Sequence, residues 1–595
     1  MVKGDSIAGA CSCWVLAALF VAGMLQLWLQ LKEVQVEDAA EYNYASMRQS
    51  IRRVQIGGVR GRILDRHGRV LGGNRQSLSI VCLPSVFQRK TWEGTVSNIE
   101  AAVIFAGDII GRKATLKRDT IARHVRRSLA MPLLVWRGID NVELARFSEH
   151  EREMPGFAIE ESVDRVYPEG FLAAHVIGYV GRDRGAMESG DEKFNFFSME
   201  MRGRDGLELY YDDFLKGVAG ERKVLVDARG FAIRDWTVTQ PLAGLDLRLT
   251  LDVGIQRAVE RELDGCVGAC VVIDPRNGGV LALASAPAYD LNDFVPFLSH
   301  EEYDKHLKDP RKPLFNRATG GKYAPGSTFK PVTAMSALSL GYPAEVKYCC
   351  KGVFEYATMR LHCASRWGHG DLDLRHALMK SCNPFFCNLA LETGTNAIIA
   401  AAAAFGLGKK TGIDLGMDAA GTIPDGDWKL CRRGEKWVIG DLVHMAIGQG
   451  MLEVSPLQMA LLAGAIGTGY RVVPHLRIDA PAERIPLPFA TEQLAVVREG
   501  MRMVVAGDGE SSGSGRRGGE GVAVSVSGKT GTAEVDENGK RHKNAWFIAY
   551  APSDQPTVAI AMVIENGESG GATAAPRVRN VLAHIFGERS EVARR

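Results

Sequence analysis

Ser327 and Lys330 have the residue types and the spacing of an activated serine nucleophile. The proline–glycine pair before Ser327 predicts that a helix begins there, so one helical turn would bring both side chains to the same face. A lysine desolvated beside the serine could take its proton, and free backbone N–H groups at the helix N-terminus would surround the hydroxyl. Chance alone gives about two Ser-x-x-Lys matches in a chain of average composition and this length, so the pair needs further support.

A second motif, Ser381-Cys382-Asn383, offers another hydroxyl and an amide. The Ser381 hydroxyl could pass a proton to a leaving group, and the Asn383 amide could hold a substrate. Without the other motifs, Ser381 would equally be explained as a helix-capping serine.

Lys-Thr-Gly occurs twice, at Lys410-Thr411-Gly412 and at Lys529-Thr530-Gly531-Thr532. We interpret the first copy as structural, because it lies in an expected loop after an alanine-rich helix. The second copy follows the alternating run Val522–Ser527, which predicts a strand. There the lysine and threonines would face a substrate carboxylate, and the Thr532 N–H would stabilise an oxyanion. The glycine would let another chain lie close along the strand.

Four of the cysteines beyond the N-terminal segment lie between Cys349 and Cys382. Three of them and one histidine have the spacing Cys-x12-Cys-x5-His-x12-Cys: Cys350, Cys363, His369 and Cys382. Three thiolates and an imidazole are a typical tetrahedral zinc set, although Cys349 could replace Cys350. One or two disulfides in an oxidising compartment are the alternative. A metal here would hold the Ser381 loop in place, and we expect none to take part in the bond chemistry.

The elements that must position these residues are expected from about residue 246 onward. Alternation and periodicity predict strands at 247–251, 269–275, 279–284, 522–527, 545–550 and 558–565, and helices at 253–263 and 574–587. Helices dominate 327–465. The expected assembly is one sheet built from both ends of this segment with an all-helical insertion between them. The Gly-, Ser- and Arg-rich residues 507–521 are expected to form a mobile loop.

The preceding segment is expected to be an elongated, strand-rich platform. Residues 34–53 are predicted to form a mostly helical stalk, His67-Gly68 a hairpin turn, and residues 90–160 helices with polar faces. Glycine-rich stretches between 167 and 230 continue the platform, and none of them has the residues of an active site.

The N-terminus predicts a membrane anchor. No charged residue lies between Asp5 and Lys32, and residues 7–31 are long enough to cross a hydrocarbon core as a helix. The run is too long for a cleaved signal peptide and lacks a small-residue cleavage site, and the flanking charges are too few to orient it. The whole chain has 595 residues, 46% of them hydrophobic, and a formal charge of +2. These values exclude long disorder and multi-span architecture, and they indicate no nucleic-acid partner.

Together the three motifs form the set found in penicillin-binding proteins and serine β-lactamases. Further matches are Gly448-Gln449-Gly450 within the domain, and upstream Arg60–Arg66 and Gly206-Leu207-Glu208, which resemble the platform of class B penicillin-binding proteins. A free-standing β-lactamase would have neither platform nor anchor. The resemblance implies an α+β protein with a short cytoplasmic tail (1–6), a transmembrane helix (7–31), a non-catalytic pedestal (32–245) with a head insertion at about 90–160, a transpeptidase domain (246–587) and a tail (588–595).

Within class B the chain is similar to the penicillin-binding protein 2 group, which works in cell-wall elongation. The shared features are Arg165-Val166-Tyr167-Pro168, the run Ala174–Gly181 and the cysteine cluster. Some members of this group carry a metal at this place, which favours a structural zinc, and the group's Cys-x-Gly pattern favours Cys350 as the ligand. The group also makes Trp546 a candidate floor of the substrate groove, although core packing explains it as well.

The resemblance implies a D,D-transpeptidase of the inner membrane with its catalytic domain on the periplasmic side. Ser327 would attack a stem peptide ending in D-Ala-D-Ala with Lys330 as base, Ser381 would relay a proton, and Asn383 and the second Lys-Thr-Gly-Thr would hold the donor. β-Lactams would acylate Ser327, and carboxypeptidase activity would be a side reaction. The implied partners are a membrane glycan polymerase of the SEDS family and rod-complex scaffold proteins. Alternatives are a division-specific class B transpeptidase, a β-lactam sensor or hydrolase, and an idle scaffold.

Overall fold

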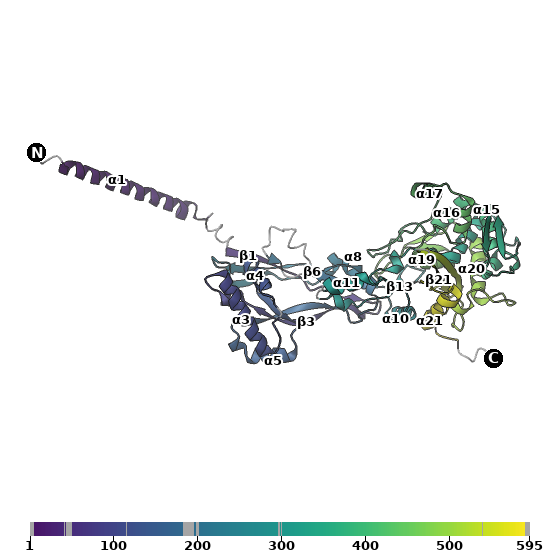
Figure 1. Cartoon of the computed structure of the whole chain (residues 1–595), viewed down its shortest axis with the longest axis horizontal. Coiled ribbons are helices and arrows are strands. Elements are labelled where there is room, and N and C mark those ends of the chain that lie inside the picture. The colour runs from purple at the N-terminus through teal and green to yellow at the C-terminus, as the bar shows by residue number, and fades with distance from the viewer. Residues whose placement is uncertain are drawn as a thin grey trace.

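The computed structural model describes residues 5–40, 42, 50–114, 116–182, 196–197, 201–295, 298, 300–537 and 540–589. The molecule is elongated, with an isolated N-terminal helix at one end, a strand-rich region in the middle and a larger mixed domain at the other end (Figure 1). This is the expected α+β architecture of an N-terminal apolar helix, a pedestal and a C-terminal domain.

The N-terminal helix α1 (Asp5–Lys32) continues into η1 (Glu33–Glu37). In the described part of the chain, one helical stretch, Trp14–Glu37, is long and apolar enough to cross a membrane, and none of it is buried. The first part of the expected helical stalk, residues 34–40 and 42, is largely helical, residues 41 and 43–49 lie outside the described residues, and from Ile51 the chain is a strand.

Two sheets build the pedestal. The first has the order β10 (Ala232–Thr239), β9 (Gly220–Val226), β1 (Ile51–Ile56) and β7 (Phe196–Phe197). The second has the order β11 (Leu247–Arg248), β2 (Ile63–Leu64), β3 (Val70–Cys82) and β4 (Leu133–Arg137), and β5 (Phe157–Val166) also pairs with β3. Smaller elements complete it: β6 (Val180–Arg182), β8 (Met201–Gly203), α6 (Ala174–Ile177), α8 (Gly206–Tyr210) and α9 (Asp212–Leu215).

The head insertion differs from the expectation of helices alone. It contains η2 (Pro84–Phe87), α3 (Trp92–Ile110), α4 (Arg118–Arg127), α5 (Asn141–Glu149) and η3 (Glu151–Glu153), and also the strand β4. Its helices also have a buried face, because Ile99, Val103 and Ile110 of α3 lie in a core with Trp136 of β4. Pairing with β3, far away in the sequence, is what makes Leu133–Arg137 a strand.

A buried ion cluster joins three segments of the pedestal. Glu208 accepts hydrogen bonds from Arg60 Nε at 2.6 Å, Arg165 Nε at 2.7 Å and the Tyr167 hydroxyl at 3.2 Å. Arg60 also pairs with Asp212 at 2.7 Å. Burying two guanidinium groups is favourable only while the carboxylates stay charged and hydrogen-bonded.

The exchange Glu208→Gln is therefore expected to destabilise the pedestal by about 3–5 kcal/mol, because it leaves a buried positive charge without its partner. The full-length protein would show this as an earlier unfolding transition in denaturant. The matched control is Asp246→Asn, which breaks the exposed pair with Arg62 and should cost less than about 1 kcal/mol. Equal unfolding midpoints for the two variants would contradict the importance of the cluster.

The C-terminal domain is built on one five-stranded antiparallel sheet. Its order is β13 (Val280–Ala286), β12 (Gly268–Ile273), β22 (Val558–Ile564), β21 (Lys540–Ala551) and β20 (Ser527–Glu537). Helices α10 (Val253–Leu263) and α21 (Ala575–Phe586) pack on one face with η7 (Gly570–Ala574) beside them. The expected sheet from both ends of the segment is confirmed, and β20 is its edge strand.

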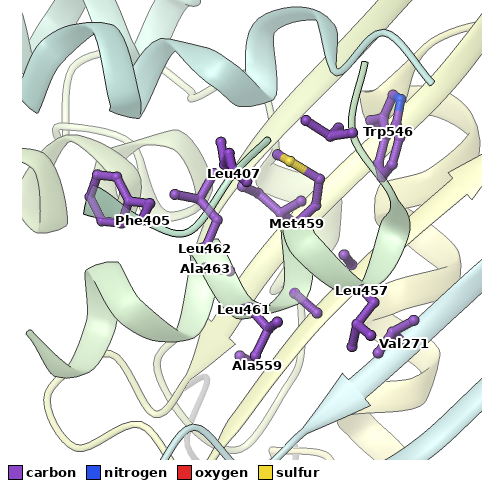
Figure 2. Packing of buried hydrophobic residues seen from close by; sticks show 14 of the residues in the cluster. Val271, Phe405, Leu407, Leu457, Met459, Leu461, Leu462, Ala463, Trp546 and Ala559 are labelled. Carbon is purple, nitrogen blue, oxygen red and sulfur yellow. The ribbon is translucent and has the colours of Figure 1, made fainter. Parts of the chain in front are cut away.

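The insertion covers the other face of the sheet. It begins with η4 (Leu291–Phe294), α11 (His300–Lys308), α12 (Arg317–Gly320), η5 (Gly326–Phe329) and α13 (Lys330–Ser339). It continues with α14 (Leu374–Lys380), α15 (Asn383–Thr393), α16 (Thr395–Ala404), α17 (Gly426–Arg433), α18 (Ile439–Ala446), α19 (Pro456–Thr468) and α20 (Thr491–Ala506). Buried α19 packs its leucines and Met459 between the sheet and the surrounding helices (Figure 2).

Two sequence-based expectations for this domain are wrong. The insertion is not all-helical, because it contains the short pairs β14 (Tyr348–Cys350) with β17 (Gly370–Leu372), β15 (Val353–Tyr356) with β16 (Met359–His362), and β18 (Tyr470–Val472) with β19 (Arg484–Pro486). The strand expected at Val522–Ser527 begins only at Ser527, where pairing with Tyr550 starts. Residues 507–521 form a loop, as expected, which contains the short turn η6 (Arg516–Gly518) with a buried Gly518.

Candidate functional site

Ser327 lies in η5, the turn that leads directly into α13. The preceding Gly326 has a φ of +56°, and its N–H donates to the Gly448 carbonyl at 2.8 Å. A Cβ on Gly326 would lie 2.9 Å from the Thr532 carbonyl oxygen. The glycine therefore lets the serine turn lie directly against β20, as the proline–glycine–serine sequence predicted for a helix start.

Lys330 is fully buried one turn after Ser327. Its Nζ donates to the Ser381 carbonyl at 2.7 Å, to Asn383 Oδ1 at 2.7 Å and, more weakly, to Ser381 Oγ at 3.4 Å. Burial lowers the pKa of this lysine to about 8. A large fraction of the amine is then neutral near pH 8 and can accept a proton.

Ser381 and Asn383 lie at the junction of two helices. Ser381 ends α14 in the left-handed conformation, with φ of +54°, and Asn383 begins α15 after a single intervening residue. The Asn383 Nδ2 donates to the His362 carbonyl at 3.0 Å, while its Oδ1 holds Lys330. Ser381 is thus not a helix N-cap, and its strained backbone turns its hydroxyl toward two lysines.

Lys529, from the edge strand β20, completes the group around Ser381. Its Nζ donates to Ser381 Oγ at 2.8 Å and to the Thr530 carbonyl at 3.0 Å. Burial, and then the neighbouring Lys330 charge, lower its pKa well below the usual lysine value. Two amino groups that meet at one hydroxyl cannot both stay charged without repulsion, so a proton is readily lost from the pair.

The rest of the second Lys-Thr-Gly-Thr runs along the edge of the sheet beside the serine turn. Thr530 donates its hydroxyl to Ser514 Oγ at 3.1 Å, and Thr532 Oγ1 accepts from the Gly570 N–H at 3.3 Å. A Cβ on Gly531 would lie 2.8 Å from the Pro325 carbonyl. The glycine therefore permits this close approach of the strand to the serine turn.

Two residues that contact this strand were not predicted from their sequence. Gln449 Nε2 donates to the Thr532 carbonyl at 3.2 Å, and Ser514 receives the Thr530 hydroxyl. Gln449 lies in a motif that the family resemblance singled out without assigning it a role. Ser514 gave no signal, because the composition of its segment predicted only a loop.

The predicted metal ligands come together in one cluster. The ligand atoms of Cys350, Cys363, His369 and Cys382 all lie within 4.8 Å of one another, and the three cysteines are buried free thiols. Cys363 Sγ lies 3.4 Å from His369 Nδ1 and 4.0 Å from Cys382 Sγ. Such a cluster of soft ligands fits a tetrahedral zinc ion, and it brackets the Ser381–Asn383 loop.

The remaining residues that the sequence singled out make contacts that stabilise the fold. In the first Lys-Thr-Gly copy, Asp418 accepts from the Thr411 hydroxyl at 3.1 Å and from the Gly412 N–H at 2.9 Å. Trp546 is fully buried in β21, the strand beside β20, and its Nε1 donates to the Ala324 carbonyl at 3.1 Å. His67 Nε2 lies 3.0 Å from Asp252 Oδ2, so it links the pedestal to the C-terminal domain.

Three segments thus meet at one place and bring together the predicted site residues Ser327, Lys330, Ser381, Asn383, Lys529 and Thr532. A hydroxyl at a helix start, a desolvated amine and a sheet edge next to it are the groups that acyl transfer through a serine ester requires.

Family comparisons match nearly the whole chain. The penicillin binding protein transpeptidase domain model matches residues 268–583, and the penicillin-binding protein dimerisation domain model matches residues 55–249. Peptidoglycan D,D-transpeptidase MrdA from Acinetobacter baumannii is 32% identical over 93% of this chain and 84% of its own length. The Escherichia coli protein of the same name is 32% identical over 96% of this chain and 93% of its own length.

Solved structures of similar proteins have the same fold as this chain. Penicillin-binding protein 2 of Helicobacter pylori, in a complex with MreC, superposes with a TM-score of 0.77 at 26% identity, covering 90% of this chain and 99% of that one. A chain from a peptidoglycan synthase complex that coordinates polymerisation and cross-linking has a TM-score of 0.73 at 27% identity, covering 98% of this chain and 99% of that one.

Proposed function

Because the chain belongs to the class B penicillin-binding proteins, within the penicillin-binding protein 2 group, we propose that it is the D,D-transpeptidase that cross-links peptidoglycan during cell-wall elongation. The observation that carries the proposal is the meeting of Lys330, Asn383 and Lys529 around Ser381, beside the turn that carries Ser327. These groups match the needs of a serine acyl-enzyme mechanism.

In the first step Ser327 Oγ attacks the carbonyl of the penultimate D-alanine of a donor stem. Lys330, neutral because it is desolvated, takes the hydroxyl proton. The backbone N–H groups of Ser327 and Thr532 stabilise the oxyanion. Asn383 holds the donor peptide, which lies along the edge of β20.

The donor carboxylate determines which of the two lysines is protonated. Lys529, with Thr530 and Thr532, binds this carboxylate, and the negative charge favours protonation of Lys529 over Lys330. The amide C–N bond then breaks, and Ser381, which contacts both amines, passes a proton to the nitrogen of the departing D-alanine. Ser327 remains esterified to the donor stem.

In the second step an amine of another stem attacks the ester. The new amide bond forms, the ester C–O bond breaks, and the proton returns to Ser327 Oγ. When water replaces the amine, the same chemistry gives carboxypeptidase side activity. A β-lactam enters as a mimic of the donor, and its acyl-enzyme persists because the nitrogen released by ring opening stays attached to the acyl group and blocks the approach of a second stem.

A structural zinc ion fits the cluster of Cys350, Cys363, His369 and Cys382, whose ligand atoms are already close together. When bound, zinc would supply charge neutralisation and a fixed cross-link between these ligands. The chain's own contribution is the position of Cys382 between Ser381 and Asn383. Holding Cys382 in place fixes the two side chains that hold Lys330.

We expect the full-length protein to contain one zinc ion per chain, and His369→Ala to lose it and to unfold at a lower temperature. Metal analysis of the purified protein and thermal unfolding check this. The control is His362→Ala, an exposed histidine on the neighbouring strand β16. Metal-free protein with disulfides among the three cysteines would contradict the zinc assignment.

We further propose that α1 anchors the protein in the inner membrane, with the catalytic domain on the periplasmic side. The solved complexes of similar proteins, with MreC and in a peptidoglycan synthase, support two kinds of partner. These are rod-complex scaffold proteins and a membrane glycan polymerase of the SEDS family, which would contact the anchor and the pedestal.

Depletion of the protein in its own organism tests the elongation role. Loss of rod shape is expected, and a Ser327→Ala copy should not restore it. Filamentation of the depleted cells would instead support a division-specific transpeptidase.

A further inference from the structure

Residues 512–515 form a short segment beside the active site that is held in place by its backbone. The Ser514 N–H donates to the Met379 carbonyl of α14 at 3.3 Å, and the Gly515 N–H donates to the Val504 carbonyl of α20 at 2.9 Å. Both bonds use main-chain atoms alone. The position of the segment therefore does not depend on the side chain of Ser514.

Both branches of the Thr530 side chain contact this segment. The hydroxyl donates to Ser514 Oγ at 3.1 Å, and a Cβ on Gly515 would lie 3.4 Å from Thr530 Cγ2. Thr530 is 8% exposed, whereas Ser514 is exposed to solvent. The segment thus holds the side chain of Thr530 in one orientation on the edge strand β20, and Ser514 is the residue that contacts its hydroxyl.

The two hydroxyls can exchange the roles of donor and acceptor. Each hydroxyl can do both, so the bond between Thr530 and Ser514 can run in either direction while the oxygens stay where they are. In the described part of the chain, Ser514 Oγ has Thr530 as its hydrogen-bond partner and no acceptor for its own proton. When Ser514 donates to Thr530, the Thr530 proton is free for another acceptor, and a hydroxyl that accepts a hydrogen bond is itself a stronger donor.

We propose that Ser514 is a positioning residue for the terminal carboxylate of the donor stem. The inference rests on the proposed function, in which Thr530 binds this carboxylate together with Lys529 and Thr532. When the donor binds, the Thr530 O–H turns to a carboxylate oxygen and Ser514 donates to Thr530 Oγ1, so the bond between the two hydroxyls is kept. Ser514 therefore favours donors and β-lactams that carry a charged carboxylate over compounds that lack one.

Benzylpenicillin and its methyl ester separate this role from a purely structural one, because the ester lacks the charged carboxylate. The measurement is the second-order rate of acylation of the full-length protein by each compound, followed by intact mass. We expect Ser514→Ala to slow acylation by benzylpenicillin about fivefold, and acylation by the ester less than about twofold, because a neutral ester accepts a weaker hydrogen bond. Ser514→Cys keeps the shape of the side chain but is a weak donor, and should lower the ratio of the two rates in the same direction. Both variants leave the nearby charges of Arg516 and Arg517 unchanged.

The matched control is Ser512→Ala, because Ser512 accepts from Lys380 Nζ, at 3.2 Å, through its backbone carbonyl. This variant should react with both compounds like the unchanged protein. A rate ratio in the two Ser514 variants equal to that of the unchanged protein would overturn the assignment, whether both rates fall together or neither falls. A ratio that falls equally in Ser512→Ala would also overturn it. Only a failure of benzylpenicillin to acylate the unchanged protein would count against the proposed function itself.

Discussion

Replacing Ser327 by alanine is expected to lower the rate of cross-linking by about 10⁴-fold or more, because no other group can form the covalent intermediate. Ser381 has a hydroxyl in the same group, but it lies between two amines and accepts from Lys529 at 2.8 Å. The measurement is the formation of cross-linked stem dimers by the full-length protein, with the two stems separated by mass.

A suitable control is Ser339→Ala at the far end of the same helix α13, where the hydroxyl only donates to the Ser336 carbonyl at 2.7 Å. This variant should cross-link at the normal rate. Residual cross-linking by Ser327→Ala above the level of the uncatalysed reaction would mean that another residue carries the acyl group.

The second large effect is expected for Lys330→Gln, which should slow acylation by about 10²–10⁴-fold because it removes the general base. The pH dependence follows from the lowered pKa of this lysine, about 8. Only the neutral amine accepts the serine proton, so acylation of the unchanged protein should rise as the pH increases toward 8 and level off above it. In Lys330→Gln this rise should disappear.

Rates of benzylpenicillin acylation, measured between pH 6 and pH 10, check both the slower acylation of Lys330→Gln and the loss of its pH dependence. Lys322→Gln, an exposed lysine just upstream of the serine turn, serves as the control and should keep the normal pH profile. A pH-independent rate in the unchanged protein, or an unaltered profile in Lys330→Gln, would assign the base to another group, with Lys529 the nearest candidate.

The local parts of this site could be predicted because they depend on neighbours in the sequence. The helix start at Ser327 follows from Pro325 and Gly326, and one turn fixes where Lys330 lies. The side chains that Lys330 contacts come from residues 381 and 383, and no periodicity predicts that contact. The order of the three motifs, matched to a family, supplied this long-range information.

Residues 507–521 form the expected loop, but composition did not predict how its glycines pack. Their glycines predicted a mobile loop, yet a Cβ on Gly518 would lie 2.3 Å from the Phe547 ring, and one on Gly515 would lie 3.0 Å from it. The glycines therefore permit close packing against Phe547 of β21, and this packing brings Ser514 to Thr530. From the sequence alone, a glycine that permits close packing cannot be distinguished from a glycine that makes the backbone flexible.

The strand boundary near Val522 has a similar cause. Val522 and Val526 are buried, which produced the alternating pattern, but their backbone has no continuous partner strand. Pairing with β21 begins at Ser527, so Lys529 lies inside the strand and not after it. Its position in the ladder is what fixes its amine against Ser381.

The most direct test of the central claim is the intact mass of the full-length protein after exposure to benzylpenicillin, followed by peptide mapping. A single stable adduct on Ser327 that is absent from Ser327→Ala is predicted. An adduct that is lost within seconds would indicate a hydrolase. No adduct on folded protein, or an adduct on another residue, would contradict the assignment of Ser327 as the acylated serine of a D,D-transpeptidase.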